Sequence, residues 1–248
     1  MTKRVALVTG GNGGIGSAIC AELASQGHAV VAGYFPPEKE AAEAWQKEMK
    51  DQGLEIDLAA MDVSNFADCE RAVGEIAGKH GSVDILVNCA GITRDGVLKK
   101  MPEENWKAVM ATNLDSAFNV TRHVLNGMLD KGWGRIVNIA SVNGQRGQFG
   151  QANYSAAKAG MHGFTMAVAL ETAAKGITVN TVSPGYIATA MTSAMPENVL
   201  EAIVNSVPMR RMGKPEEIAN AVAWLASEGN GYTTGANIPV NGGLFTSH

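Results

Sequence analysis

The sequence has few of the residues that mark unusual environments. It has three cysteines among 248 residues, Cys20, Cys69 and Cys89, and their spacing matches neither a metal site nor a disulfide framework. No apolar run reaches the ~20 residues that a membrane-spanning helix needs, and no signal-type stretch precedes the first predicted strand. These absences predict a reduced, cytoplasmic protein with no membrane partner.

Positive charge is also scarce. Lys and Arg number 20 against 24 Asp and Glu, for a net charge of −4, so a nucleic-acid partner has no electrostatic support. The five histidines lack metal-ligand spacing, and we expect no metal. We find no linker, charge block or repeat, so a single domain over residues 1–248 is expected.

Apolar, β-rich runs alternate with longer helical stretches, as in a parallel sheet covered on both faces. We predict an α/β protein, a single-domain, Rossmann-type, doubly wound parallel sheet of about seven strands. The expected strands are 5–8, 29–32, 56–60, 85–87, 135–139, 178–182 and 238–240. The expected helices are 15–26, 38–52, 66–80, 103–129, 154–175, 197–205 and 215–227. The irregular, methionine-rich stretch 187–213 suits a mobile substrate lid.

A glycine-rich turn joins the first predicted strand to the first helix. Its glycines follow the spacing Gly-x-x-x-Gly-x-Gly, at Gly10, Gly14 and Gly16. Glycine lets the backbone approach a pyrophosphate, whose charge then lies at the helix N-terminus. The turn therefore predicts a nucleotide cofactor, and a glycine-rich turn without a ligand is the weaker alternative.

The residues after the second predicted strand affect the choice of nucleotide. No arginine follows the strand, Glu38 and Glu40 would repel a 2′-phosphate, and Lys39 alone would attract one. NADH, or dual specificity for NADH and NADPH, is slightly favoured. Asp62, just after the third strand, is placed either to accept a hydrogen bond from the adenine amino group or to serve as an ordinary loop carboxylate.

Tyr154 and Lys158 lie four residues apart on one face of a predicted helix. A cation beside a tyrosine favours the phenolate and brings the pKa of the tyrosine toward working pH. Ser141 lies thirteen residues upstream of Tyr154. The spacing alone is weak, because any long helix produces it. Together with the glycine turn it is the strongest indication of function in the sequence.

These residues resemble the short-chain dehydrogenase/reductase superfamily, over the whole chain. The matching landmarks are Thr9-Gly-x-x-x-Gly14-x-Gly16, Asp62, Asn88-Cys-Ala-Gly91, Asn113, Ser141, Tyr154-x-x-x-Lys158 and Pro184-Gly185. Cys89 departs from the family pattern, which has a second asparagine that braces the central sheet. The departure concerns local rigidity rather than chemistry.

The resemblance implies four catalytic residues. Tyr154 would give its proton to a carbonyl oxygen as hydride reaches the carbon, and Lys158 would hold the nicotinamide ribose and lower the pKa of the tyrosine. Ser141 would hydrogen-bond the same oxygen. Asn113, inside the predicted helix 103–129, would hold a water that relays protons to the lysine.

The resemblance also implies a cofactor site around the glycine turn and the ends of the strands. Asn88, Ala90 and Gly91 would pass beside the adenosine ribose through their backbone, and Thr189 would contact the cofactor from the lid. The full set is Gly10, Asn12, Gly14, Ile15, Gly16, Tyr34, Asp62, Val63, Asn88, Ala90, Gly91, Tyr154, Lys158, Pro184, Gly185, Ile187 and Thr189.

Within the superfamily, the segments 91–95, 133–138, 141–151 and 183–189 closely resemble the acetoacetyl-CoA reductases. Those enzymes reduce acetoacetyl-CoA to (R)-3-hydroxybutyryl-CoA for polyhydroxybutyrate synthesis, and most use NADPH. The loop with Glu38 and Glu40 departs from that default and leaves the cofactor open.

The same resemblance implies the residues that bind the substrate. Phe149 would offer an apolar wall to the four-carbon chain, and the glutamines would hydrogen-bond thioester or pantetheine groups. Lys100 would contact the CoA arm, or form a solvated pair with Lys99. The full set is Asp95, Lys100, Ser141, Gln148, Phe149, Gln151, Tyr154 and Tyr186.

Two other functions stay open. A 3-oxoacyl-[acyl-carrier-protein] reductase would want a basic rim near its entrance, which Arg94, Lys99, Lys100 and Arg146 could supply. A nucleotide-binding sensor or scaffold need not keep a catalytic acid, yet all four catalytic residues are present. The resemblance also implies a homotetramer, formed through the helices at 103–129 and 154–175 and the C-terminal strand region.

Overall fold

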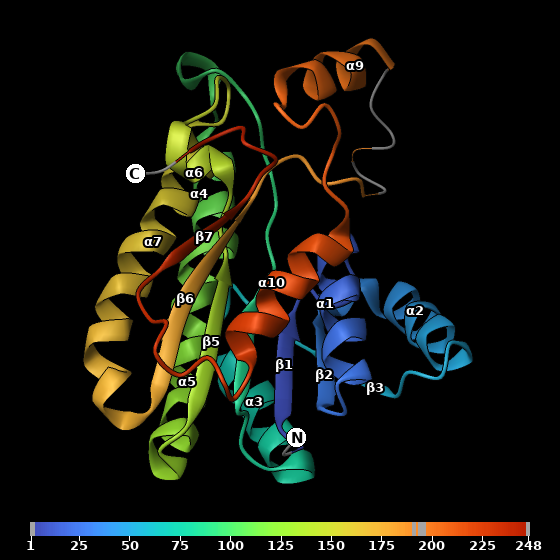
Figure 1. The fold of residues 1–248 in the computed structure, drawn as a ribbon, viewed down its shortest axis with the longest axis vertical. Helices are drawn as coiled ribbons and strands as arrows, with labels where there is room; N and C mark the ends of the chain where they lie inside the picture. The colour runs from blue at the N-terminus through green and yellow to red at the C-terminus, as the bar shows by residue number, and fades with distance from the viewer. Residues whose placement is uncertain (1–2, 190–191, 193–196, 247–248) are drawn as a thin grey trace.

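All the predicted strands form in the structure, a computed structural model that describes residues 3–189, 192 and 197–246. Their ends match the prediction or differ from it by one or two residues. They pair in the order β3-β2-β1-β4-β5-β6-β7 (Figure 1), and every pair is parallel. The strands are β1 (Val5–Thr9), β2 (Ala29–Tyr34), β3 (Ile56–Ala60), β4 (Ile85–Asn88), β5 (Gly134–Ile139), β6 (Ile177–Pro184) and β7 (Asn237–Val240).

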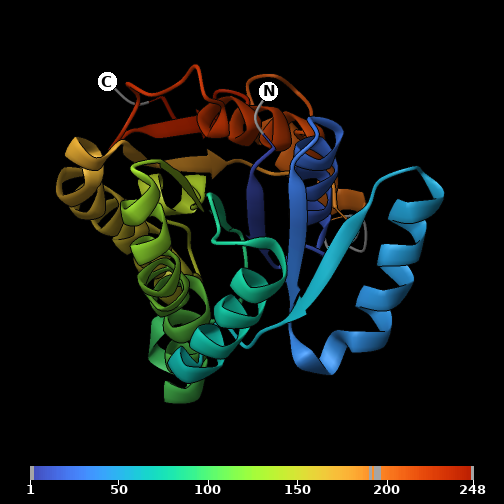
Figure 2. The ribbon, with the colours of Figure 1, turned by 90° about the horizontal axis from the view of Figure 1, so that it is seen from below.

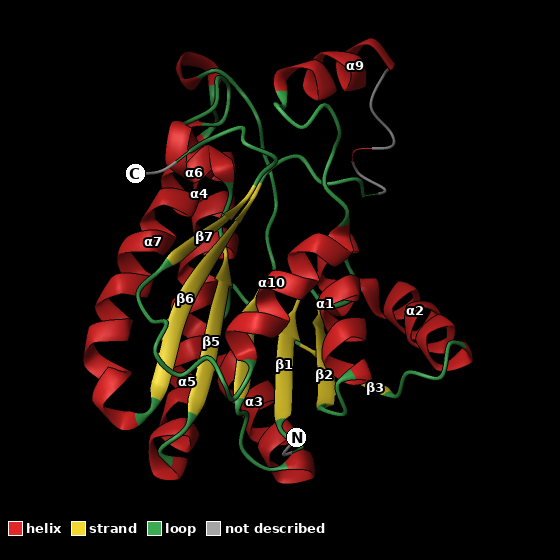
Figure 3. Cartoon of the chain, viewed as in Figure 1, coloured by secondary structure: helices red, strands yellow, loops and turns green. Residues whose placement is uncertain are grey.

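The predicted helices also form, and Figure 3 shows them around the sheet. They are α1 (Gly14–Ser25), α2 (Lys39–Asp51), α3 (Phe66–His80), α4 (Glu103–Met110), α5 (Ser116–Lys131), α7 (Ala152–Thr172), α9 (Glu197–Ser206) and α10 (Pro215–Ala226). The short helix α6 (Val142–Arg146) was not predicted, because five residues are too few to show helical periodicity. No helix in the described part of the chain is long and apolar enough to cross a membrane.

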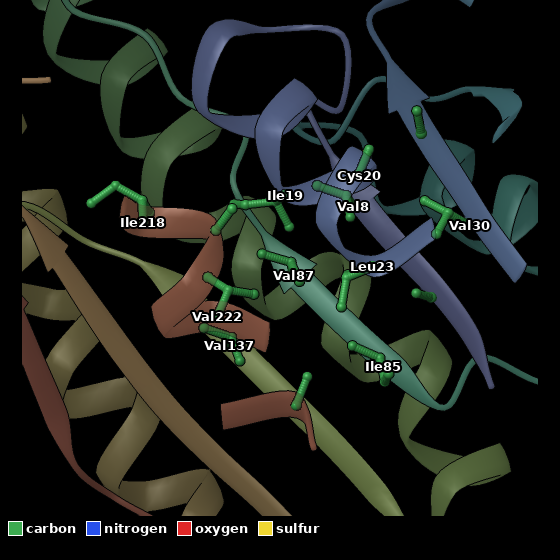
Figure 4. Packing of buried hydrophobic residues seen from close by; sticks show 14 of the residues in the cluster. Val8, Ile19, Cys20, Leu23, Val30, Ile85, Val87, Val137, Ile218 and Val222 are labelled. Carbon is green, nitrogen blue, oxygen red and sulfur yellow. The ribbon is translucent and has the colours of Figure 1, made fainter. Parts of the chain in front are cut away.

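The strands are apolar because helices cover both faces of the sheet. In β1, Val8 packs with residues of α1, α2 and α10, whereas Leu7 packs with residues of α3, α5 and α7. Figure 4 shows the first layer, with Leu23 of α1 and Val222 of α10 near Val87 of β4. Figure 2 shows helices on the two sides of the sheet. The predicted doubly wound α/β fold is confirmed.

The strand order reverses between β1 and β4. β1 pairs with β2 on one side and with β4 on the other. From β1 the chain continues to β2, whereas from β4 it continues to β5 in the opposite direction across the sheet. In open α/β sheets such a reversal opens a crevice at the carboxyl ends of the strands, where ligands bind. The fold thus places a ligand site where Thr9 and Asn88 end their strands.

The predicted helix 103–129 is continuous but not uniform. Between α4 and α5, the residues Ala111–Asp115 form a wider π-helical turn, and Asn113 within it is fully buried. Such a turn inserts one extra residue and commonly lies at a functional site. The prediction of a single α-helix was therefore correct in extent and missed this local change.

The two ends of the predicted lid lie side by side, at Ile187 and Gly213. Gly213 N–H donates to the Tyr186 carbonyl at 2.9 Å, and Ala188 N–H donates to the Gly213 carbonyl at 2.8 Å. α9 lies between these two points along the chain. Residues 190–191 and 193–196 of the predicted lid lie outside the described residues, and its mobility stays a prediction.

Candidate active site

The turn between β1 and α1 is shaped for an anion. Gly10 has φ +64°, which glycine adopts without strain, and a Cβ on Gly16 would lie 2.1 Å from the Gly10 carbonyl oxygen. The N-cap of α1 is Gly13, which has no side chain to bond the N–H groups of the first turn. A pyrophosphate fits this arrangement, since it would accept those N–H groups.

The other predicted cofactor residues gather around this turn. A Cβ on Gly14 would lie 2.8 Å from Thr189 Cγ2, and a Cβ on Gly10 would lie 3.0 Å from Ala90 Cα. Gly185 N–H donates to the Val240 carbonyl at 3.0 Å, which brings the end of β6 to the same edge. The side chain of Ile187 belongs to the hydrophobic core, so any contact with a cofactor would come from its backbone.

Thr9 is a residue of this site to which sequence reasoning assigned no role. Its Oγ1 accepts the backbone N–H groups of Cys89 at 3.0 Å and Ala90 at 3.1 Å. The bonds fix the segment after β4 against the end of β1, where the adenosine ribose is expected. A buried hydroxyl at a strand end, directly before the glycine turn, was the signal for this role.

Asn88 is buried and points into the sheet rather than toward the crevice. Its Nδ2 donates to Asn138 Oδ1 at 2.8 Å, and Asn138 Nδ2 donates to Thr165 Oγ1 at 2.8 Å. These bonds join β4, β5 and α7 beside Cys89, where the family's second asparagine is missing. The predicted ribose contact of Asn88 is left to its backbone.

The residues predicted to surround the adenosine make local contacts of their own. Asp62 Oδ1 accepts from Ser64 N at 3.0 Å and from Ser64 Oγ at 2.7 Å, so this carboxylate shapes its loop, and its adenine contact stays a prediction. Val63 and Tyr34 are largely buried. Asn12 Nδ2 donates to Glu38 Oε2 at 3.4 Å, which places a carboxylate next to the glycine turn.

Ser141 and Tyr154 lie together beyond the end of β5. Ser141 is the N-cap of α6, and its Oγ accepts the Asn143 N–H at 3.1 Å. Tyr154 lies in the first turn of α7. Burial raises the pKa of Tyr154 above its usual value, the hydrogen bond with Ser141 lowers it, and the nearby Cys89 and Asp95 raise it further. The net effect keeps the phenol protonated at neutral pH.

Lys158 is only 3% exposed. Its Nζ donates to the Ile139 carbonyl at 2.7 Å and lies 5.8 Å from the centre of the Tyr154 ring. Burial lowers the pKa of Lys158 to about 8. The expectation that this cation brings the pKa of Tyr154 toward working pH is wrong, because burial of the phenol raises that pKa.

Asn113 braces the loop that follows β4. Its Oδ1 accepts the Ile92 N–H at 2.8 Å, and its Nδ2 donates to the Ile92 carbonyl at 2.9 Å. A Cβ on Gly91 would lie 3.5 Å from Asn113 Oδ1 and 3.6 Å from Lys158 Nζ. The predicted catalytic residues therefore converge, and the predicted water-holding role of Asn113 stays a prediction.

The predicted substrate residues divide into two groups. Gln151 Nε2 donates to Asp95 Oδ2 at 2.9 Å, and Gln151 is the N-cap of α7, in which Tyr154 lies in the first turn. Phe149 is 88% exposed, so in a single chain it forms no wall. Gln148 and Lys100 are also exposed.

Tyr186 lies at the base of the lid, and the described lining of its cavity includes none of the other predicted substrate residues. It lines a cavity of about 320 Å³ with Val207, Met209 and Gly242 among others. In the described ranges of the chain, no group of three or more His, Cys, Asp and Glu side chains forms a candidate metal site.

Known proteins resemble this chain over almost its full length. Residues 10–245 match the family model described as enoyl-(acyl carrier protein) reductase. The chain is 61% identical over 242 residues to an acetoacetyl-CoA reductase of Allochromatium vinosum, covering 98% of each. It is 54% identical over 244 residues to that of Cupriavidus necator, covering 98% of this chain and 99% of the relative. It is 46% identical over 247 residues to a 3-oxoacyl-[acyl-carrier-protein] reductase of Haemophilus influenzae, covering 100% of each.

Proposed function

Because the chain belongs to the short-chain dehydrogenase/reductase superfamily, we propose that it reduces acetoacetyl-CoA to (R)-3-hydroxybutyryl-CoA with NAD(P)H, in the cytoplasm. The product is the precursor for polyhydroxybutyrate synthesis. The observation that carries this proposal is the convergence of Ser141, Tyr154 and Lys158 at the sheet edge that also holds the glycine turn. Relatives at 54–61% identity are acetoacetyl-CoA reductases.

The residues of the site suit the two halves of a ketone reduction. Bound NAD(P)H supplies the hydride that adds to the carbonyl carbon. Tyr154 gives its phenolic proton to the carbonyl oxygen, for which its raised pKa keeps it in the acid form. Ser141 donates a hydrogen bond to the same oxygen. Lys158 keeps N–H groups beyond its bond to Ile139, which can hold the ribose hydroxyls and stabilise the phenolate that forms.

The surroundings of Glu38 support NADH use or dual specificity, although NADPH is the family default. The Glu38 carboxylate lies next to Asn12 at the glycine turn, where it would repel a 2′-phosphate. The neighbouring cation of this loop, Lys39, pairs with Glu43 at 3.7 Å. Steady-state kinetics with acetoacetyl-CoA should show NADH turnover at least comparable to that with NADPH. A strong NADPH preference would overturn this interpretation of Glu38.

A second candidate is the reduction of 3-oxoacyl groups on acyl carrier protein. Arg94, Lys99, Lys100 and Arg146 are all exposed near the substrate side and would attract an acidic carrier. A comparison of kcat/KM for acetoacetyl-CoA and for the carrier-bound thioester decides between the two. Equal or higher activity on the CoA ester supports our proposal, and a large preference for the carrier replaces it.

Exposed apolar side chains on α5 and α7 support association into a homotetramer. Phe118 stacks on Phe66 with ring centres 5.8 Å apart, and both are more than one-third exposed. Leu170 is 85% exposed on α7, and Figure 1 shows α5 and α7 on the same flank of the molecule. We include this self-association in the proposal, together with a lid over residues 187–213 that closes on the substrate.

A further inference from the structure

A short chain of hydrogen bonds links Ser141 to Gln151 and Asp95, two of the predicted substrate residues. Asn143 lies in α6, and its backbone N–H donates to Ser141 Oγ at 3.1 Å. The side chain of Asn143 donates from Nδ2 to Gln151 Oε1 at 2.9 Å. Gln151 in turn donates from Nε2 to Asp95 Oδ2 at 2.9 Å. Asn143 therefore bonds both to the Ser141 hydroxyl and to the Gln151 amide.

Asp95 sets the direction of this chain. An ionised carboxylate only accepts hydrogen bonds, so Gln151 must turn its amide nitrogen toward Asp95. The amide oxygen of Gln151 then faces Asn143, which must offer its own nitrogen. Turning either amide over would bring two oxygens or two N–H groups face to face. The contacts of Asn143 thus allow one orientation of each amide.

Asn143 is held at a position that gains little stability from its amide. It is buried, and among the described residues its Oδ1 is buried without a hydrogen-bond partner. A buried acceptor without a partner destabilises the folded state. A Cβ on the next residue, Gly144, would lie 2.7 Å from the Lys158 carbonyl carbon, so α6 is in backbone contact with α7 at the catalytic lysine. The amide of Asn143 therefore contributes more to the orientation of Gln151 than to stability.

We propose that Asn143 is a positioning residue for the proposed reduction. It holds the amide of Gln151 in one orientation. It also keeps a constant distance between that amide, which would bind the substrate, and the Ser141 hydroxyl, which would bind its carbonyl oxygen. Asn143 acts through Gln151 and does not contact the reacting atoms. The inference rests on the proposed function and goes beyond it, because neither the sequence nor the resemblance assigns a role to Asn143.

The first test is a double-mutant cycle of Asn143→Ala and Gln151→Ala. Each single variant should lower kcat/KM for acetoacetyl-CoA by about tenfold or more, since small displacements of positioning groups are costly. The double variant should be no worse than Gln151→Ala alone, within about twofold, because the first residue acts through the second. Thermal unfolding of the cofactor-free variants should show the same non-additivity. Additive losses in both measurements would overturn the proposal.

The matched control is Asn180→Ala. Asn180 is a buried asparagine of β6, outside the catalytic residues, that donates to the Thr233 carbonyl and accepts from Ala236 N. Because it removes two buried hydrogen bonds, it should lower thermal stability at least as much as Asn143→Ala does, and it should leave kcat/KM unchanged. A loss of kcat/KM in Asn143→Ala no larger than in this control would reduce Asn143 to a structural residue.

The second test uses Asn143→Asp, which keeps the shape of the side chain. This variant remains informative if the alanine variant fails to fold. An ionised aspartate at this position cannot donate to Gln151 Oε1, but a protonated one can. The kcat/KM of this variant should therefore rise relative to wild type as the pH falls. Asp95, Lys158 and Arg146 are charged neighbours in every variant, so the difference reports the substituted position. A pH profile parallel to that of wild type would contradict the proposal.

Measurements on the wild-type protein separate the proposed function from the positioning role of Asn143. If wild type does not turn over acetoacetyl-CoA with either nicotinamide, the proposed function fails, and the unfolding cycle still reports whether Asn143 acts through Gln151. If wild type is active and Asn143→Ala equals the Asn180→Ala control, only the positioning role fails.

Discussion

The folded protein buries the ammonium group of Lys158, and burial disfavours its charged form. Burial lowers its pKa from 10.5 to about 8, so between these pH values the unfolded chain binds more protons than the folded one. The stability of the wild type should therefore rise as the pH increases from about 8 toward 10.5. The ammonium is retained for the reaction at some expense of stability, as is common at active sites.

Replacing this lysine should separate stability from activity. Lys158→Met should abolish turnover and raise the free energy of unfolding of the cofactor-free protein by about 1–3 kcal/mol at pH 7. The gain should shrink as the pH rises above 8, where the wild-type lysine loses its proton. Urea denaturation at several pH values measures it. The exposed Lys47→Met is the control, and a gain independent of pH would show that packing, not charge, is responsible.

Ser141 should control the pH range of the reaction as well as its rate. Its hydrogen bond lowers the pKa of Tyr154, so Ser141→Ala should raise that pKa further. Since the tyrosine must be protonated to act as an acid, the alkaline limb of the kcat/KM profile should move to higher pH. The maximum should fall about 10²-fold or more. An alkaline limb that stays in place would disprove this link between Ser141 and Tyr154.

Tyr154→Phe tests whether the protein is an enzyme at all. The variant lacks the acid, so kcat should fall by about 10²–10⁴-fold. Cofactor binding, measured by nicotinamide fluorescence, should be little changed, because the ring and Lys158 remain. Unchanged reductase activity would favour a binding or scaffold role instead.

Among the elements, the turn between β1 and α1 tolerates the least change. Gly16→Ala would place a Cβ 2.1 Å from the Gly10 carbonyl oxygen, so the turn must open and its N–H groups must move. Cofactor affinity should drop at least about tenfold, with a loss of stability. Isothermal titration and thermal unfolding measure the two effects.

Gly78→Ala on α3 is the matched control for this change. A Cβ there meets no atom within 4 Å, and alanine favours the helix, so the variant should gain about 0.5–1 kcal/mol. Cofactor affinity should not change. Equal cofactor affinity in Gly16→Ala and Gly78→Ala would contradict the role given to the turn.

The sequence predicted these elements well because their patterns are local. The apolar runs, the glycine turn and the spacing of Tyr154 and Lys158 are visible in neighbouring residues. The position of Thr9 before the glycine turn was visible in the sequence, but its partners Cys89 and Ala90 lie about 80 residues away and were not. The π-helical turn at Asn113 likewise left no local pattern. The pKa of Tyr154 was misjudged for the same reason, since burial depends on the whole fold.

On the scale of the whole molecule, the exposed apolar surface of α5 and α7 predicts self-association. Phe118→Glu should reduce the tetramer to smaller species, since a charge would be buried without a partner in the interface. Light scattering coupled to size-exclusion chromatography measures the mass. Ala44→Glu, on the exposed side of α2, is the control and should stay tetrameric. A monomeric wild type would remove the proposed assembly.

The strand order has a consequence for synthesis of the chain. β1 emerges first, yet one of its two neighbours, β4, begins only at Ile85, after β2 and β3. Until β4 arrives, the edge of β1 offers unpaired backbone groups, which invite aggregation. The glycine turn also lacks its contact with Ala90 until then. Gly14 gains its contact with Thr189 later still, after Ser141, Tyr154 and Lys158 have emerged, so the nucleotide-binding and catalytic halves of the site are not separable modules.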